Sequence, residues 1–191
     1  MDKDAPQEFV AATASIAKAN IRSEVTVEAI PSPTRVAPHS VALAGEVLSM
    51  GSDDSLHGSG RLILMHDEEQ GDTWGGPFRI VCFVQSPLEA EIRLDPIVSD
   101  VVWSWLIDAL DTAGASYSSA SGTATRVLSK GYGELADQGE TGHLELRASW
   151  TPEGSDMSGH VSAWSSLLCL LAGLPPTTDV VSLNARKRER G

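Results

Sequence analysis

Long apolar runs are missing from this chain of 191 residues, and the longest is LLCLLAGL at residues 167–174. A membrane-spanning helix needs about 20 consecutive apolar residues, so we expect no transmembrane segment. The chain starts MDKDAPQEF, which has neither the basic residues nor the apolar stretch of a secretory signal. These absences predict a cytoplasmic protein without a membrane partner.

Cysteine is scarce, with only Cys82 in FRIVCFV and Cys169 in SLLCLLA. Neither has a second cysteine at CxxC spacing, so we expect neither a disulfide framework nor a zinc site. In apolar sequence a free thiol behaves as a small hydrophobe, whereas a reactive thiolate needs an electropositive and partly open environment. Both cysteines are therefore predicted to be core residues rather than nucleophiles.

Catalytic signatures are also missing, because the chain contains no GxSxG, HExxH, P-loop or Rossmann glycine pattern. The segment HDEEQGD, residues 66–72, places His66 among four carboxylates that could hold a hard cation. It lacks the ordered alternation of a calcium loop, which favours an ordinary acidic surface loop. We therefore predict no catalytic residue, no metal site and no cofactor, and the sequence favours a protein that is not an enzyme.

Positive charge is in short supply, with 14 Lys and Arg against 26 Asp and Glu and a formal net charge of −12 at pH 7. The end of the chain, ARKRERG, holds four of the basic residues and one acid, which leaves a body at −15 and a tail at +3. An acidic body repels phosphate backbones, so nucleic acid is not an expected partner. We expect one domain over residues 1–184 and a disordered basic tail over 185–191. The alternatives are a tail that touches an anionic partner and a tail that folds back on the chain's own acidic surface.

Hydrophobic periodicity indicates which secondary structure is present. Apolar residues recur every three or four positions in residues 5–21, 95–114 and 159–174, as in amphipathic helices. Two-residue alternation predicts strands at residues 23–30, 39–50, 60–67, 77–86, 116–129 and 142–150. Short hairpins and grouped helices predict an α+β fold: a single domain with a largely antiparallel sheet of about six strands and three helices, in the order α-β-β-β-β-α-β-β-α.

The predicted helix over residues 95–114 is apolar on two sides. One stripe includes Trp105, and a second consists of Trp103, Ile107 and Leu110. Because each helical residue turns by about 100°, Trp103 and Trp105 point about 160° apart. One hypothesis is that the Trp105 stripe covers the chain's own sheet while Trp103, Ile107 and Leu110 meet a partner, which would make a homodimer. The alternative is that the final helix covers the second stripe within one chain.

Arginines fall inside predicted strands, where charged residues are less usual. Arg61, Arg79, Arg126 and Arg147 lie in GRLIL, FRIVCF, TATRVLS and ELRASW. If their faces coincide, four guanidinium groups on one sheet surface could bind a carboxylate or phosphate. The alternative, cross-strand pairing with carboxylates such as Glu145 and Glu46, is more usual for sheets and is favoured.

Several segments taken together carry a resemblance to a known family. They are PSPTRVAPHSVALAGEV, GSGRLILMHDEEQGDTWGGPFRIVCFV, VVWSWLIDAL, GTATRVLSKGYGEL, LELRASWTP and HVSAWSSLLCLLAGLPP. The chain resembles, over nearly its whole length, the actinobacterial family of domains of unknown function numbered three thousand. That resemblance implies no activity, and it covers neither the first residues nor the basic tail.

Two functions remain open. The order of predicted elements resembles that of the secretion chaperones, which are acidic homodimers that hold a segment of a client protein, although one additional strand precedes the middle helix here. This similarity favours a non-enzymatic binding or chaperone-like protein that acts through a hydrophobic helix face on a protein partner or a second copy. The alternative is a small-molecule binder or enzyme that uses the arginine-lined sheet face for an anionic ligand.

Overall fold

The structure is a computed structural model that describes residues 5–48, 56–89 and 94–176. Its helices are α1 (Gln7–Ile16), α2 (Gly71–Trp74), α3 (Val98–Thr112) and α4 (Ser158–Leu171). Its strands are β1 (Val25–Ile30), β2 (His39–Leu48), β3 (Leu56–His66), β4 (Phe78–Pro87), β5 (Tyr117–Lys130) and β6 (Glu140–Pro152). The predicted α+β fold and the order of its long elements are confirmed. The short α2 and two 3₁₀ helices, Glu68–Gln70 and Gly133–Gln138, are additional.

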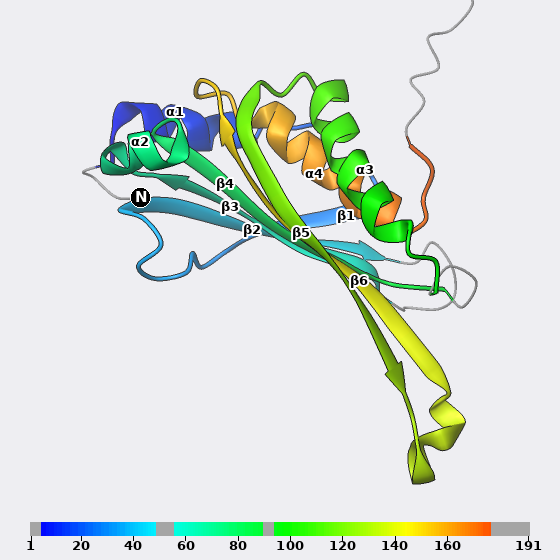
Figure 1. Cartoon of the computed structure of the whole chain (residues 1–191). Coiled ribbons are helices and arrows are strands. Elements are labelled where there is room, and N and C mark those ends of the chain that lie inside the picture. Colours follow the sequence, from blue (N-terminus) through cyan, green and yellow to red (C-terminus); the bar gives the residue numbers. More distant parts are fainter. Residues whose placement is uncertain (1–4, 49–55, 90–93, 177–191) are drawn as a thin grey trace, which may run out of the picture.

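One antiparallel sheet contains the six strands in the order β1-β2-β3-β4-β6-β5. The last hairpin folds back so that β6 pairs with β4, and β5 is left at the edge opposite β1. Helices α3 and α4 lie on one face of the sheet (Figure 1). We call this the helix face, and we call the opposite face the open face.

Strand alternation divides the side chains between these two faces. Phe78, Ile80, Cys82 and Val84 of β4 are buried under the helices, and their neighbours in sequence lie on the open face. The approach of α4 to the sheet is close, because a Cβ atom at Gly45 would lie 2.7 Å from Cη2 of Trp164. Glycine at this position therefore lets the largest side chain of α4 pack directly against the backbone of β2.

Strand β3 starts earlier than its sequence suggests. Residues 51–60 are rich in Gly, Ser and Asp and predict a connection, yet Leu56–Gly60 belong to the strand. A Cβ atom at Gly60 would lie 2.9 Å from both Leu168 and Val84, so the glycine that indicates a turn in the sequence is required by helix packing.

Helix α1 ends at Ile16, short of the predicted residue 21. Helix α3 begins at Val98, and the Asp95 side chain before it accepts a hydrogen bond from the backbone N–H of Ile97. The predicted tail at 185–191 lies outside the described residues.

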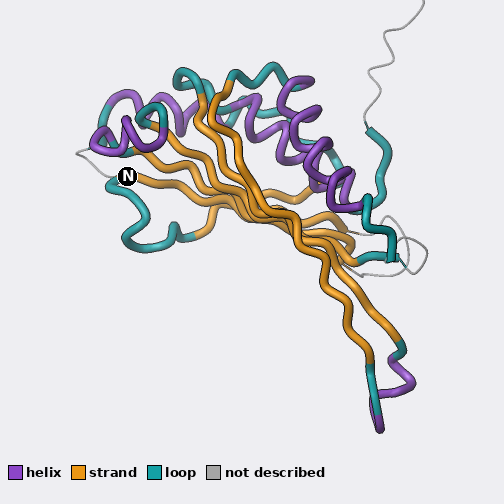
Figure 2. Tube along the Cα trace, in the orientation of Figure 1, coloured by secondary structure: helices purple, strands orange, loops and turns teal. Residues whose placement is uncertain are grey.

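The hairpin of β5 and β6 reaches beyond the rest of the sheet. Strand β4 pairs with β6 only from His143 to Trp150, whereas β5 and β6 stay paired as far as Lys130 and Glu140. Figures 1 and 2 show the result, a two-stranded arm that projects away from the body and carries the 3₁₀ helix Gly133–Gln138 at its tip. An isolated two-stranded ribbon is only marginally stable in water.

Candidate functional site: the open face of the sheet

Helix α3 uses both of its apolar sides within its own chain. The ring of Trp103 lies over β5, where a Cβ atom at Gly122 would be 2.8 Å from Cζ3 of Trp103. Leu110 is fully buried, and Trp105 is half-buried against the core. Leu110 therefore belongs to the core and is not available to a partner, and it is strand β5, rather than the final helix, that lies beneath Trp103. Ile107, which is half-buried, lies one helical turn after Trp103.

The register of the sheet separates the four strand arginines. Arg61, Arg79 and Arg147 alternate with buried residues of the helix face and so lie on the open face. Arg126 pairs with the buried Leu144 and lies on the helix face, where its Nη1 donates a hydrogen bond to the backbone oxygen of Asp95. Arg126 therefore does not share a surface with the other three arginines. The pairing register of β5 with β6 places its side chain on the helix face instead of the open face.

Two of the remaining arginines flank an aromatic ring. Phe83 is the cross-strand partner of Arg61 on one side and of Arg147 on the other. The Arg147 guanidinium lies 5.5 Å from the centroid of the Phe83 ring and 3.4 Å from a carboxylate oxygen of Glu145. Arg61 is exposed and makes no hydrogen bond or ion pair with another described residue. The row Arg61, Phe83 and Arg147 thus offers one apolar ring between two cationic groups.

Arg79 lies four residues away along β4 and has a different role. Its Nη1 donates to the backbone oxygen of Ser119 and to the hydroxyl of Thr151, and its Nη2 donates to the hydroxyl of Ser149. Partial burial without a carboxylate partner lowers the pKa of Arg79. These bonds hold the irregular start of β5, where the register shifts between Ser118 and Ser121, against β6. The arginines of the open face therefore do not converge on one point.

An apolar row crosses the open face next to Phe83. The sheet register aligns Ile30, Ala42, Ile63 and Val81 on four neighbouring strands. Ile63, Val81 and Phe83 are partly buried, and α3 and α4 pack on the other face of the sheet. We refer to Ile63, Val81 and Phe83 with Arg61 and Arg147 as the open-face patch. These partly buried apolar side chains are bordered by charged residues, which makes the group a candidate interaction surface.

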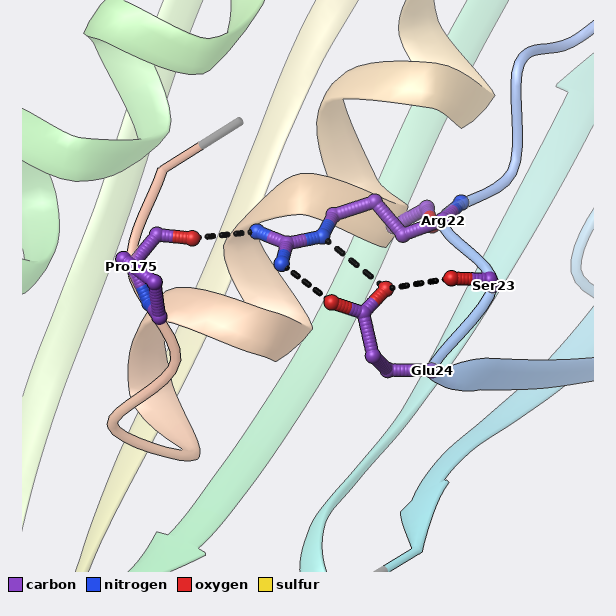
Figure 3. A network of polar contacts seen from close by, with 5 residues as sticks. Arg22, Ser23, Glu24 and Pro175 are labelled. Atoms are coloured by element: carbon purple, nitrogen blue, oxygen red, sulfur yellow. Dashed lines mark hydrogen bonds and ion pairs between the residues drawn. The ribbon is translucent and has the colours of Figure 1, made fainter. Parts of the chain in front are cut away.

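A cavity of about 590 Å³ lies on the other side of the molecule, bordered by residues 20–24, α3 and α4. Arg22 enters it with a side chain that is only 7% exposed and donates hydrogen bonds to both carboxylate oxygens of Glu24 and to the backbone oxygen of Pro175 (Figure 3). The hydrogen bond from Arg22 holds the pKa of Glu24 at about 2. The Arg22–Glu24 pair has no net charge, and the hydrogen bond to Pro175 joins the segment before β1 to the end of α4. Sequence analysis missed it, because two charged residues in a connection carry no signal of burial.

A family model covers nearly all of the chain. A model of a protein family of unknown function, DUF3000, matches residues 5–181. The chain belongs to this family. The match covers all of the described elements, in agreement with the resemblance carried by the sequence segments. No curated protein and no solved structure matches the chain.

Nucleophiles and potential metal ligands in this DUF3000 chain are dispersed. Burial raises the pKa of the Cys82 thiol to about 12 and that of Cys169 to about 11, so both thiols stay protonated and unreactive at neutral pH. His66 does not join the acidic residues that follow it, because its ring is buried 4.8 Å from the centroid of Phe78. In the ranges that the structure describes, no three His, Cys, Asp or Glu residues are grouped as metal ligands would be.

Among the same residues, no helix has both the length and the apolar character needed to cross a membrane.

Proposed function

We propose that this protein is a cytoplasmic, non-enzymatic binding protein that holds an extended segment of a partner protein on its open face, in the manner of a chaperone. The observation that carries this proposal is the open-face patch. Phe83 stands between Arg61 and Arg147 beside the apolar row that includes Ile63 and Val81. The patch is a continuous strip on regular strands, which suits a flat or extended ligand better than a small molecule that needs a concave site.

The chemistry of the patch indicates which segment would fit. Ile63, Val81 and Phe83 offer apolar contact area, while the exposed guanidinium of Arg61 can take a carboxylate. An extended peptide presents alternate side chains to the same side. We therefore infer a segment in which apolar residues lie close to Asp or Glu.

Defined peptides test this proposal without knowledge of the natural partner. We would measure fluorescence anisotropy of three labelled peptides, which alternate Leu with Glu, Leu with Lys, and Ser with Glu. The Leu/Glu peptide is expected to bind, and Phe83→Ser is expected to weaken its binding by about tenfold, or about 1.4 kcal/mol. Thr26→Ser, at an exposed position on β1, is the control and should leave binding unchanged. Equal binding of Leu/Glu and Leu/Lys peptides, or no effect of Phe83→Ser, contradicts the proposal.

An anionic small molecule is the second candidate, favoured by the lack of a carboxylate partner for Arg61 in the part of the chain that the structure describes. The two candidates differ in what they need from Phe83. Inorganic phosphate or the Ser/Glu peptide would depend on Arg61 and Arg147 alone. If either competes with the Leu/Glu peptide and survives Phe83→Ser, the arginines form an anion site and the binding of apolar segments is excluded.

A further inference from the structure

The two edges of the sheet differ in how they are protected from pairing with another chain. An exposed edge strand is a template for another strand, and natural proteins block it with short length, charge or proline. Strand β1 has six residues, includes Glu28, and is followed by Pro31 and Pro33. Strand β5 has 14 residues and no proline, and it carries no charge from Tyr117 to Thr125. Strand β5 therefore lacks the short length and the prolines that protect β1, and its charges, Arg126 and Lys130, lie in its last five residues.

We propose that β5 is a homodimerisation edge, which pairs antiparallel with β5 of a second copy about a two-fold axis near Thr125. This inference is independent of what the open face binds. The register shift between Ser118 and Ser121 limits the regular part of the edge to Ser121–Lys130, and Thr125 lies at the middle of that segment. An antiparallel pair of identical strands about a two-fold axis is an isologous interface, which closes at two copies.

The side chains along this edge are self-complementary about Thr125. On the open face, Ser121 would lie opposite Ser129, Thr123 opposite Val127, and Thr125 opposite Thr125 of the other copy, so no like charges meet. On the helix face, Leu128, which is 48% exposed, would lie opposite Gly122, the residue beneath the Trp103 ring. An exposed leucine in one copy would thereby contact a half-buried tryptophan in the other.

Charged residues near the axis are already engaged within the chain. Arg126 donates its hydrogen bond to Asp95, and Lys130 forms an ion pair of 3.1 Å with Glu140. Neither guanidinium nor ammonium group would need to leave its partner for a second β5 to approach. The Trp103 ring lies over the same edge, so this residue would border the strand pairing and would not form its backbone hydrogen bonds.

The projecting arm is evidence that the partner of β5 is a second copy of the chain and not a free peptide. Beyond Leu128 the hairpin has no third strand on either side in the described structure, and its tip exposes Tyr132 at 75% and Leu135 at 54%. In the proposed register the regular part of the second copy's β5 begins opposite Ser129, at the base of the arm. The tip then reaches the start of the partner's β5, where its apolar side chains can be covered.

A matched pair of substitutions tests the edge. Thr125 and Thr26 are both exposed, both on the open face, and each is the cross-strand partner of a glutamate, Glu145 and Glu46 respectively. Thr125→Lys and Thr26→Lys therefore each place an ammonium group opposite a carboxylate within one chain, although Glu145 already contacts His143 and Arg147. Only Thr125→Lys would place two ammonium groups directly opposite each other at the two-fold axis.

Solution mass by light scattering is the first measurement. The unaltered chain and Thr26→Lys are expected to be dimers, and Thr125→Lys a folded monomer or a dimer weakened by at least about tenfold. Leu128→Ser should weaken the dimer as well, since this side chain is half-exposed in one copy. Thermal unfolding followed by circular dichroism checks that each variant remains folded.

Cysteine cross-linking tests the register and detects a weak dimer. Directly opposed residues in an antiparallel pair have Cα atoms about 4.5–5.5 Å apart, which a disulfide can span. Thr125→Cys should form a covalent dimer on mild oxidation, whereas Thr26→Cys should not, and the native Cys82 and Cys169 are buried.

Three results would overturn the proposal. The first is a monomer at every concentration with no cross-link through Thr125→Cys. The second is a dimer that Thr125→Lys leaves intact. The third is a monomer whose peptide binding is abolished by Thr125→Lys but not by Thr26→Lys, which would mean that the edge takes a peptide strand instead of a second copy.

Discussion

Trp150 and His160 join the end of β6 to the start of α4, because Nε1 of Trp150 donates a buried hydrogen bond of 3.0 Å to Nδ1 of His160. The acceptor nitrogen must be unprotonated for this bond to exist. Burial lowers the pKa of His160 to about 4, and the nearby Asp156 carboxylate opposes that shift only in part. The imidazole is therefore neutral in the folded protein through the physiological range.

A pH dependence of stability follows from this histidine. An unfolded histidine titrates near pH 6.5, so between about pH 6.5 and 4 protons bind the unfolded chain and not the folded one. The free energy of unfolding should therefore fall as pH drops through that window, by up to about 3 kcal/mol, and His160 should add no slope above or below it. Urea unfolding at a series of pH values measures the slope. His160→Gln should flatten this part of the profile, and an unchanged slope in that variant would assign it to other groups.

Two buried histidines should respond in opposite ways to the same substitution. Both ring nitrogens of His66 lack a hydrogen-bond partner among the described residues, and the ring lies 6.0 Å from Phe9 and 4.8 Å from Phe78 between centroids. His66→Leu should be neutral or stabilising by up to about 1 kcal/mol, because it removes an unsatisfied polar group. His160→Leu should cost about 1–3 kcal/mol at pH 7, because it leaves the Trp150 N–H unpaired in the core. Chemical denaturation of both variants makes the comparison, and equal losses would contradict it.

The burial of Leu110 predicts a large effect of its truncation. Leu110→Ala should reduce the free energy of unfolding by about 2–5 kcal/mol, because the packed core leaves a cavity. The matched control is Leu94→Ala, since Leu94 is 69% exposed and its loss should change stability by less than about 0.5 kcal/mol. Denaturant titration measures both. A loss for Leu110→Ala as small as that of the control would mean that this side chain lies at a surface after all.

The contact between α4 and β2 predicts that one glycine is irreplaceable. Gly45→Ala would bring a methyl group to 2.7 Å from Trp164 and 2.8 Å from Leu168, and the overpacking should cost about 1–3 kcal/mol. Gly71→Ala is the control, because nothing lies within 4 Å of its Cβ position and its φ of −51° suits alanine. That variant should be neutral or slightly more stable. Thermal unfolding distinguishes the two, and similar melting temperatures would contradict the tight packing of α4.

The candidate site could be predicted from the sequence only in part. Two-residue alternation in FRIVCFV and ELRASW already separated Arg79 and Arg147 from the buried face of their own strands. It did not relate one strand to another, and the pairing of Arg126 with Leu144 placed that arginine on the helix face. Phe83 was not recognised as a site residue, because nothing in one sequence shows that two arginines from other strands will flank it.

Local pattern alone determined the fold class, the order of the long elements and the amphipathic character of α3, because helix and strand periods depend on neighbouring residues. Tertiary structure decided where those elements meet. It placed Trp103 on β5, buried Leu110, and drew Gly60 into β3, because each outcome depends on the closeness of segments far apart in the sequence. The order β4-β6-β5 likewise left β5 at the edge of the sheet, where it forms one strand of the projecting arm. Strand order depends on pairing between segments far apart in the sequence, which the periodicity of a single segment does not predict.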